Sequence, residues 1–394
     1  MANIAIVGAG LMGRLAALFL HRQGEQITLF DKDQKKGELS AARAAAGLLT
    51  PLGESLHCEP NIVAMGFDSL ALWPKILDSL DGYHFFQQQG SLLVSHAQDS
   101  GDFQRFAKHL KRNYVQHPCH LLSREQINEL EPELGRSFNR ALYLPEEGQI
   151  GNRKLLVALQ QQLESEQVNW LTNHHVEQIN GNRLLVNGDW QQFDLIIDCR
   201  GTGAIKSASN TVGAISDLRA VRGELFQLFA PDVHIHRPIR LMHPRYQLYI
   251  APKGKGHYVV GATEIESDDL GPMTVRSSLE LLSAAYSIHP GFAEAKIRQH
   301  VVGTRPAFSD NQPQMKLSHE LIQINGLFRH GFLIAPVLLE QLLTTVAHIK
   351  QEKPLEQLTE LVAYPELLHW QQSESSTINS NQRRYNYANN YANN

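Results

Sequence analysis

Three glycines near the start of the chain, Gly8, Gly10 and Gly13, give the strongest constraint on its fold. They follow a β-branched run at residues 4–7 and open a run of helix formers at residues 11–21. In this context the first glycine permits a tight turn, the second lets the backbone approach a pyrophosphate, and the third lets the helix pack on the strand. Asp31 ends a second predicted strand, where a carboxylate accepts hydrogen bonds from ribose hydroxyls. The pattern predicts a dinucleotide site and leaves FAD and NAD both open, although glycines also mark ordinary turns.

Composition excludes several other classes of protein. The 394 residues are 42% hydrophobic and 19% charged, which is a globular composition, and the length suggests two or three domains or lobes. A net charge of -4 gives no electrostatic reason to expect nucleic acid or an anionic membrane as a partner. Three scattered cysteines favour a reducing, cytoplasmic location and no metal site. The apolar run at residues 332–339 is shorter than the roughly 20 residues that span a bilayer, so we expect no transmembrane segment.

The order of predicted elements indicates an α/β (α+β) fold with an insertion. Strands and helices alternate at both ends of the chain, and a strand-rich region separates them. We therefore predict a discontinuous Rossmann-like domain formed by residues 1–80, 140–218 and 300–372, with an antiparallel-sheet substrate domain formed by residues 81–139 and 219–299. A capping box at Ser123 and Gln126 predicts a helix start, and residues 337–349 predict a late helix. Residues 373–394 are too polar to order themselves and are predicted to be a disordered tail.

Two further segments favour a flavin over a nicotinamide. Residues 44–49 read AAAGLL, and such small side chains let the backbone lie close to a large planar ligand. The alternative for this segment is a helix of strong formers that ends at Gly47. Residues 327–336 place Gly331 before an apolar helix, where backbone amides can face a flavin edge.

With these motifs in order, the sequence resembles the D-amino-acid-oxidase-like family of FAD oxidoreductases, and most of all its glycine oxidase and sarcosine oxidase branch. The resemblance covers most of residues 1–350. Its motifs are GAGLMG, AAAGLL, GSLLV from Gly90, the Arg222-Gly223 pair, YIAPKGKGHYVVGATE from Tyr249, GTRPAFSDNQP from Gly303 and FRHGFLIAP from Phe328. It implies FAD beneath a strand-rich substrate domain, and hydride transfer from a small amine or amino acid to flavin N5. The implied products are an imine, then an oxo compound, with hydrogen peroxide formed from molecular oxygen. A homo-oligomer is left open.

The resemblance also assigns roles to residues. The ADP half of FAD would be held by Gly8, Gly10, Gly13 and Asp31, with Val176 near the adenine. The flavin and pyrophosphate would be lined by Ala42, Arg43, Gly47, Leu48 and Leu49, and the isoalloxazine capped by Phe328, His330, Gly331, Phe332 and Leu333. Substrate would be bound by Arg305, Arg329 and Tyr249. Because no cysteine lies near residues 327–336, FAD is expected to be non-covalent.

A guanidinium suits the proposed substrate because it can bind a carboxylate through two parallel hydrogen bonds. No side-chain base is needed, since the flavin supplies the chemistry. For Arg305 and Arg329 the alternative is a surface ion pair, and for Tyr249 it is strand packing. The chain departs from the family pattern at Ala42-Arg43, Gly151-Asn152-Arg153, Arg200, Leu327 and His330. These departures keep open a dehydrogenase, a biosynthetic tailoring oxidoreductase acting on another amine, and a flavin-binding partner subunit.

Overall fold

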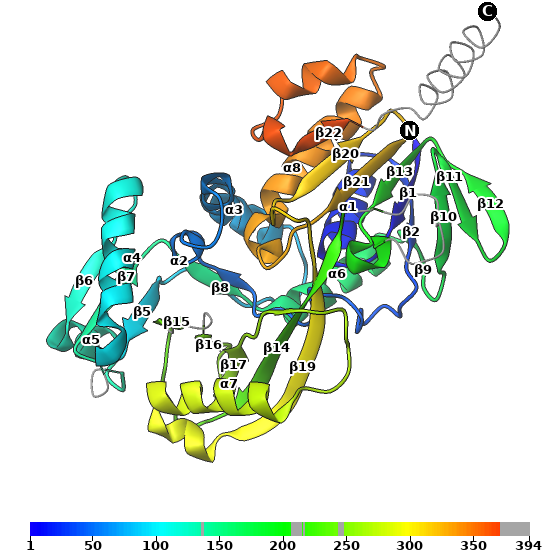
Figure 1. The fold of residues 1–394 in the computed structure, drawn as a ribbon. Coiled ribbons are helices and arrows are strands. Elements are labelled where there is room, and N and C mark those ends of the chain that lie inside the picture. The colour runs from blue at the N-terminus through cyan, green and yellow to red at the C-terminus, as the bar shows by residue number, and fades with distance from the viewer. Residues whose placement is uncertain (135–137, 206–214, 216, 243–247, 371–394) are drawn as a thin grey trace, which may run out of the picture.

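The computed structural model describes residues 1–134, 138–205, 215, 217–242 and 248–370, and Figure 1 shows its fold. The described chain contains a seven-stranded sheet, a nine-stranded sheet and two three-stranded sheets. The predicted tail at residues 373–394 lies outside the described residues.

The seven-stranded sheet has the order β22-β20-β21-β13-β1-β2-β9. Its strands are β1 (Asn3–Val7), β2 (Gln26–Phe30), β9 (Asn169–Leu171), β13 (Leu195–Asp198), β20 (Gln314–Leu317), β21 (Leu321–Asn325) and β22 (Leu368–Trp370). The pairs from β9 through β2, β1 and β13 to β21 are parallel. The chain leaves β1 toward β2 on one side and meets β13 on the other, so the glycine turn lies where the strand order reverses. The predicted Rossmann-like α/β fold is confirmed.

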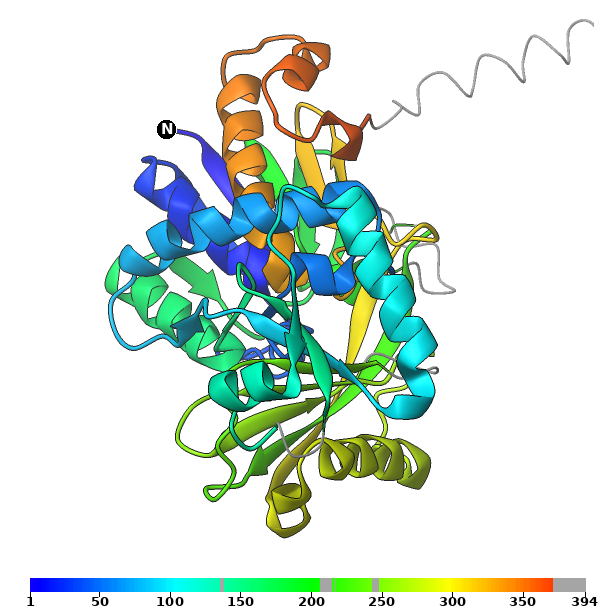
Figure 2. The ribbon, with the colours of Figure 1, turned by 90° about the vertical axis from the view of Figure 1, so that its left-hand side faces the viewer.

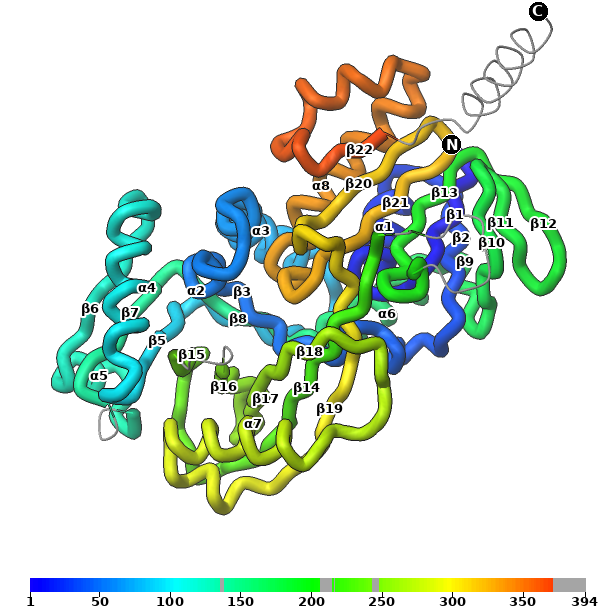
Figure 3. The backbone as a smooth tube through the Cα atoms, in the orientation of Figure 1, coloured from blue at the N-terminus to red at the C-terminus, as the bar shows by residue number. Residues whose placement is uncertain are grey.

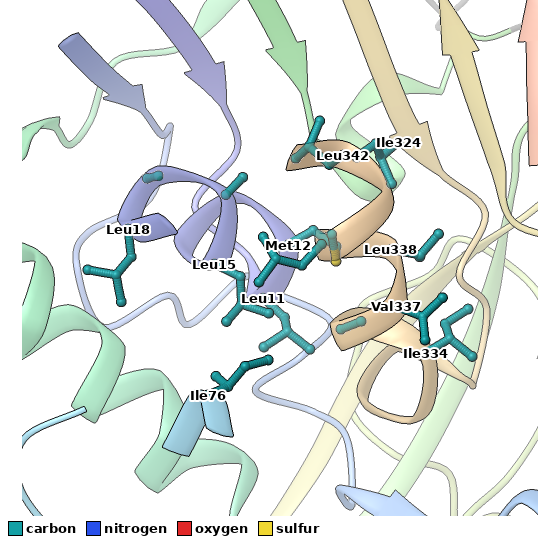
Figure 4. Packing of buried hydrophobic residues seen from close by; sticks show 14 of the residues in the cluster. Leu11, Met12, Leu15, Leu18, Ile76, Ile324, Ile334, Val337, Leu338 and Leu342 are labelled. Carbon is teal, nitrogen blue, oxygen red and sulfur yellow. The ribbon is translucent and has the colours of Figure 1, made fainter. Parts of the chain in front are cut away.

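Helices with continuous apolar faces cover this sheet. They are α1 (Leu11–Arg22), α3 (Pro60–Asp78), α6 (Asn152–Ser165) and α8 (Gly331–Ile349). Figure 4 shows Leu11, Met12 and Leu15 of α1 beside α8, with Ile76 of α3 nearby, and all of these residues belong to one buried cluster. Packing of these apolar faces fixes the start of α1, and with it the glycine turn.

Helix α8 begins at Gly331, six residues before the predicted start at residue 337, and carries Pro336 inside it. Proline cannot donate the N–H that the carbonyl four residues earlier would accept. That carbonyl belongs to Phe332, and the indole Nε1–H of Trp73 donates to it at 2.9 Å. A side chain from α3 thus takes the place of the missing backbone bond, so the proline does not end the helix.

Helix α8 is apolar along most of its length. Among the residues that the structure describes, it is the one helix whose length and hydropathy would suit a bilayer span, and 78% of its most apolar window is buried inside the protein. Its side chains pack against α1 and α3 in the core described above.

The nine-stranded sheet has the order β18-β14-β17-β16-β15-β5-β7-β6, with β19 also paired to β14. Its strands are β5 (Ser91–Ser95), β6 (His120–Ser123), β7 (Arg140–Leu144), β14 (Arg219–Phe229), β15 (Ile239–Met242), β16 (Leu248–Pro252), β17 (His257–Gly261), β18 (Ile265–Glu266) and β19 (Lys296–Ala307). All pairs except β15–β5 are antiparallel. In Figure 3 the long strands β14 and β19 run from this sheet toward the first one.

The boundaries predicted at residues 140 and 300 cut across pairings in this sheet. Strand β7 pairs with β5 and β6, so the segment that begins at Arg140 still belongs to the second sheet. Strand β19 pairs with β14 along its whole length, from Lys296 to Ala307. The sequence could not locate these boundaries because a strand's sheet is decided by partners far away in the chain.

The remaining elements connect or cover these sheets. One three-stranded sheet contains β3 (Leu48–Leu49), β8 (Gly148–Ile150) and β4 (Phe86–Gln87). The other contains β10 (Val176–Asn180), β11 (Arg183–Val186) and β12 (Asp189–Gln192). The other helices are α2 (Pro51–Glu54), α4 (Ser100–Asn113), α5 (Arg124–Leu130) and α7 (Val275–Ile288). The predicted capping box starts α5, with Ser123 and Gln126 bonded reciprocally. Figure 2 shows α7 and α8 at opposite ends of the molecule.

Candidate active site

A cavity of about 450 Å³ runs from the glycine turn after β1 to one face of the nine-stranded sheet. Gly8 and Asp31 line its part nearest β1, and Gly47 lines its side. Arg305 of β19 and Leu333 of α8 line it as well. The cavity therefore joins both large sheets and the start of α8, and it brings most of the predicted site residues together.

The glycine turn is built for close backbone packing. Gly8 has φ +97°, and a Cβ there would lie 2.7 Å from the carbonyl oxygen of Cys199. A Cβ on Gly13 would overlap the carbonyl oxygen of Gly8. Gly10 caps α1 without a side-chain hydrogen bond, so the first amides of the helix are left to the cavity. Such a helix start suits a pyrophosphate, because unpaired N–H groups and the helix dipole both favour an anion.

Asp31 lies at the carboxyl end of β2 and lines the cavity. Its carboxylate accepts hydrogen bonds from the backbone N–H of Ala9 and, at 2.7 Å, from that of Asp33. Burial raises the pKa of Asp31, although these two bonds oppose that change. An ionised carboxylate has lone pairs beyond those two, so the geometry fits the predicted contact with ribose hydroxyls.

Arg14, which the sequence did not single out, holds the glycine turn in place through hydrogen bonds to backbone carbonyls. It is 1% exposed and donates to the carbonyl oxygens of Ala9 at 2.8 Å, Leu156 at 2.6 Å and Lys35 at 2.8 Å. Burial lowers its pKa to about 10. Arg14 thereby joins α1, α6 and the loop after β2. An arginine among apolar helix positions was the available signal.

The AAAGLL segment is not a helix, so that alternative is wrong. Residues 41–44 form consecutive turns, with Ala44 N–H bonded to Ala41 C=O at 3.1 Å, and β3 follows at Leu48. Gly47 has φ +68°, and a Cβ there would overlap the Ile150 carbonyl. The small side chains line the cavity over most of residues 41–48.

Three predicted cofactor residues lie outside the cavity lining. Gly13 faces the glycine turn, and Leu49 is buried in the core. The Arg43 guanidinium points to the Lys36 carbonyl at 3.4 Å and to Glu38 at 3.9 Å. The other predicted cofactor residues line it: Gly8, Gly10, Asp31, Ala42, Gly47, Leu48, Val176, Phe328, His330, Gly331, Phe332 and Leu333.

Residues 327–333 form the wall at the start of α8. The backbone N–H of Phe328 donates to Pro306 C=O at 2.9 Å, which fastens this wall to the end of β19. Burial lowers the pKa of His330 to about 4, so its ring is neutral at neutral pH. Gly331 has open space where a Cβ would lie, and it begins the helix. Backbone amides at this point can therefore face a flat ligand in the cavity.

Strand register explains which side chains the nine-stranded sheet presents to the cavity. Tyr249 lies opposite Gly261 on one side and Arg240 on the other, so the three form a row across β17, β16 and β15. Residues directly opposite in antiparallel strands share a face. A Cβ on Gly261 would lie 2.6 Å from the Tyr249 hydroxyl oxygen. Burial raises the pKa of Tyr249 to about 12, so its hydroxyl stays protonated.

Arg305 lies against the backbone of β14, where a Cβ on Gly223 would overlap its guanidinium. Its Nη1 donates to the Thr263 carbonyl at 3.2 Å. Among the described residues it has no carboxylate within ion-pair distance. Burial lowers the pKa of Arg305, which still leaves a guanidinium charged at neutral pH.

Arg329, in contrast, is already paired. Its Nε lies 2.8 Å from Glu54 and its Nη1 3.1 Å from Glu264. Glu54 also pairs with Arg240 at 2.5 Å. Sequence reasoning missed Glu54, Arg240 and Glu264. No local sequence signal marked any of the three.

No group of three potential metal ligands occurs in the part of the chain that the structure describes. Cys199 lines the cavity beside the glycine turn, and burial raises the pKa of its thiol. The donor set is therefore amides, carboxylates and guanidinium groups around an elongated space, which suits a dinucleotide and a small anion.

Comparisons with known proteins agree with this geometry. The family described as FAD dependent oxidoreductase (DAO) matches residues 3–341. A putative thiamine biosynthesis oxidoreductase ThiO of Rhizobium etli is 34% identical over 85% of this chain and 94% of its own length. A glycine oxidase of Geobacillus kaustophilus is 23% identical over 85% of this chain and 90% of its own length. The crystal structure of a glycine oxidase from Bacillus cereus has a TM-score of 0.76 and 22% identity, and covers 91% of this chain and 97% of its own.

The glycine turn, the switch-point cavity and the match along most of the chain lead to one conclusion: the protein belongs to the DAO family of FAD-dependent oxidoreductases.

Proposed function

We propose that this protein is an oxidase of a small amino acid or a related amine. The observation that carries the proposal is Arg305, a guanidinium that faces the cavity with no carboxylate partner among the described residues. A substrate carboxylate could accept two parallel hydrogen bonds from it. Tyr249, on the same wall, can donate a further hydrogen bond because its hydroxyl is protonated.

The cavity fits FAD. The glycine turn and the open start of α1 would hold the pyrophosphate, Asp31 the ribose, and residues 41–48 and 327–333 the flavin. When bound, FAD supplies the acceptor for a hydride from the substrate's α-carbon, and molecular oxygen would then take up both electrons as hydrogen peroxide.

The chain's own residues position the substrate rather than exchange protons. His330 is neutral and buried, and burial also lowers the pKa of His57. Neither is needed as a base if the amine enters neutral, because its nitrogen lone pair assists departure of the hydride. Apolar residues such as Phe332 and Leu333 keep water from the cavity wall.

A second candidate is a biosynthetic tailoring oxidoreductase whose imine product is passed on. The relative from Rhizobium etli, named as a putative thiamine biosynthesis oxidoreductase, favours it. The named glycine oxidase relative favours the first candidate. Both share the same amine oxidation and differ in what consumes the electrons and the product. A homo-oligomeric state and a cytoplasmic location stay predictions.

Anaerobic mixing of the purified holoenzyme with glycine, sarcosine, small D- and L-amino acids and simple amines tests the proposal. We expect loss of oxidised-flavin absorbance with at least one small amino acid. Air is then admitted and hydrogen peroxide is measured. Bleaching without peroxide would point to another electron acceptor, and no bleaching by any amine would contradict the proposed function.

A further inference from the structure

The two arginines of the substrate wall differ in what surrounds their charge. Arg329 lies between Glu54 and Glu264, and these carboxylates raise its pKa against the effect of burial. Arg305 donates to a neutral carbonyl, that of Thr263. Both arginines line the same cavity, and the charge of Arg329 lowers the pKa of Arg305, so they lie near each other. The wall therefore presents one neutralised and one available cation.

Glu54 is held firmly in this arrangement. It lies at the end of α2 and is largely buried. Arg240 forms an ion pair with Glu54 at 2.5 Å, and it also donates to the Gly53 carbonyl at 2.8 Å and to the Thr50 hydroxyl at 3.1 Å. Burial alone would raise the pKa of the Glu54 carboxyl, but the charges of Arg329, the larger contributor, and Arg240 hold it well below its usual range. Glu54 therefore cannot turn away to free Arg329 for a ligand.

Glu264 closes the other side of Arg329. Its side chain is 46% exposed and lines the cavity, so it faces any ligand that approaches Arg329. A second carboxylate brought to Arg329 would meet Glu264 and Glu54, and like charges within a few ångströms repel strongly at a partly buried site.

We propose that Glu54 and Glu264 are specificity-determining residues that reserve Arg329, so that the site accepts amines with one carboxylate and rejects dicarboxylic amines. This inference rests on the proposed amine oxidation and adds the class of amine to it. A ligand's single carboxylate binds Arg305, and the part of the ligand near Arg329 must be neutral. Removing the charge of either glutamate leaves Arg329 with one carboxylate partner instead of two. Arg329 can then bind the second carboxylate of a ligand.

Two ethers that carry no amine test this without turnover. Methoxyacetate has one carboxylate, and diglycolate is the same ether with two. Each is titrated into the holoenzyme, and binding is followed by the change in flavin absorbance. The variants are Glu264→Gln, whose side chain is half-exposed, and Glu54→Gln. The matched control is Glu266→Gln, whose side chain is 66% exposed and pairs with Arg219 outside the cavity.

The wild-type protein should bind methoxyacetate about tenfold or more tightly than diglycolate. Glu264→Gln should tighten diglycolate binding about tenfold and change methoxyacetate binding less than about threefold, because Glu264 forms its ion pair with Arg329 and acts on Arg305 only at longer range. Glu54→Gln should act in the same direction, and Glu266→Gln should change neither ligand. If Glu54→Gln does not fold, the affinities of Glu264→Gln for the two ethers are sufficient to test the inference.

Equal wild-type affinity for both ethers would overturn the inference, as would an unchanged affinity ratio in Glu264→Gln. These results differ from failure of the proposed function. If no amine bleaches the flavin while the ethers follow the expected pattern, the amine oxidation is wrong and the single-carboxylate selectivity of the site stands.

Discussion

At the scale of single residues, Arg305 lies where the neighbouring strand has no side chain. Gly223 of β14 leaves the space that its guanidinium fills, and Thr263 orients it through a carbonyl. If the proposed function is right, a planar, five-donor group held in this way would receive the substrate carboxylate with little loss of entropy.

Replacing Arg305 with lysine keeps the charge and removes the two-pronged hydrogen bonding. We expect kcat/KM for the best amino acid to fall about 100-fold, mainly through KM, because lysine cannot form the two parallel hydrogen bonds to the substrate carboxylate. Flavin content should not change, since Arg305 is not expected to hold FAD. Steady-state kinetics with flavin absorbance as the control measures both, and an unchanged KM would contradict a carboxylate contact.

Gly8 offers a second prediction, for cofactor binding. Gly8→Ala combines a strained φ of +97° with crowding against Cys199, whereas Gly24→Ala has a similar φ of +89° and open space. Each should lose about 1–2 kcal/mol of stability from backbone strain. Only Gly8→Ala should also lose FAD, measured as flavin retained after gel filtration. Equal flavin retention in the two variants would show that the turn does not depend on the close approach.

At the scale of elements, the local signals were sufficient for much of the fold. Periodicity and glycine spacing predicted the first strand, α1 and the Ser123 capping box, because these depend on neighbours within a few residues. The start of α8 was misplaced because Pro336 is accommodated by Trp73, a residue from another helix. The Glu54–Arg240 pair was missed for the same reason, since only tertiary packing brings α2 to β15.

The Trp73 contact to α8 can be tested by a double-mutant cycle. Trp73→Phe leaves the Phe332 carbonyl buried and unpaired, which should cost about 1–3 kcal/mol of unfolding free energy beyond the change in volume. Adding Pro336→Ala restores a backbone N–H to that carbonyl, so the double variant should recover part of the loss. Urea unfolding of the four proteins measures the coupling, and additive effects would show that the indole bond does not replace the backbone bond.

At the scale of the whole molecule, Glu147 links helix α2 to strand β5 of the nine-stranded sheet. It is 0% exposed and accepts hydrogen bonds from Gly53 N–H at 2.7 Å and from the Ser91 hydroxyl. Burial raises its pKa to about 7, above the usual 4.5 that we take for the unfolded chain. The folded state therefore holds this proton more tightly than the unfolded state. The associated stability is fully present below pH 4.5 and is lost as pH rises to 7.

Glu147→Gln removes this titration with little change in shape. Between about pH 4 and pH 8 the wild-type protein should lose about 3 kcal/mol of stability relative to the variant. Unfolding midpoints of both proteins across that range give the difference directly. A difference that stays constant with pH, or that shrinks as pH rises, would mean that Glu147 titrates normally in the folded protein.

The residues that line the cavity extend along the sequence from Val7 to Leu333. Strand β13 pairs with β1 on one side and with β21 on the other. During translation, one edge of β13 therefore stays unpaired until the ribosome has released β21. The cavity lining is complete only after α8 has also been released. We expect nascent chains stopped before Leu321 to be prone to aggregate and unable to capture FAD, so flavin loading belongs to the end of synthesis.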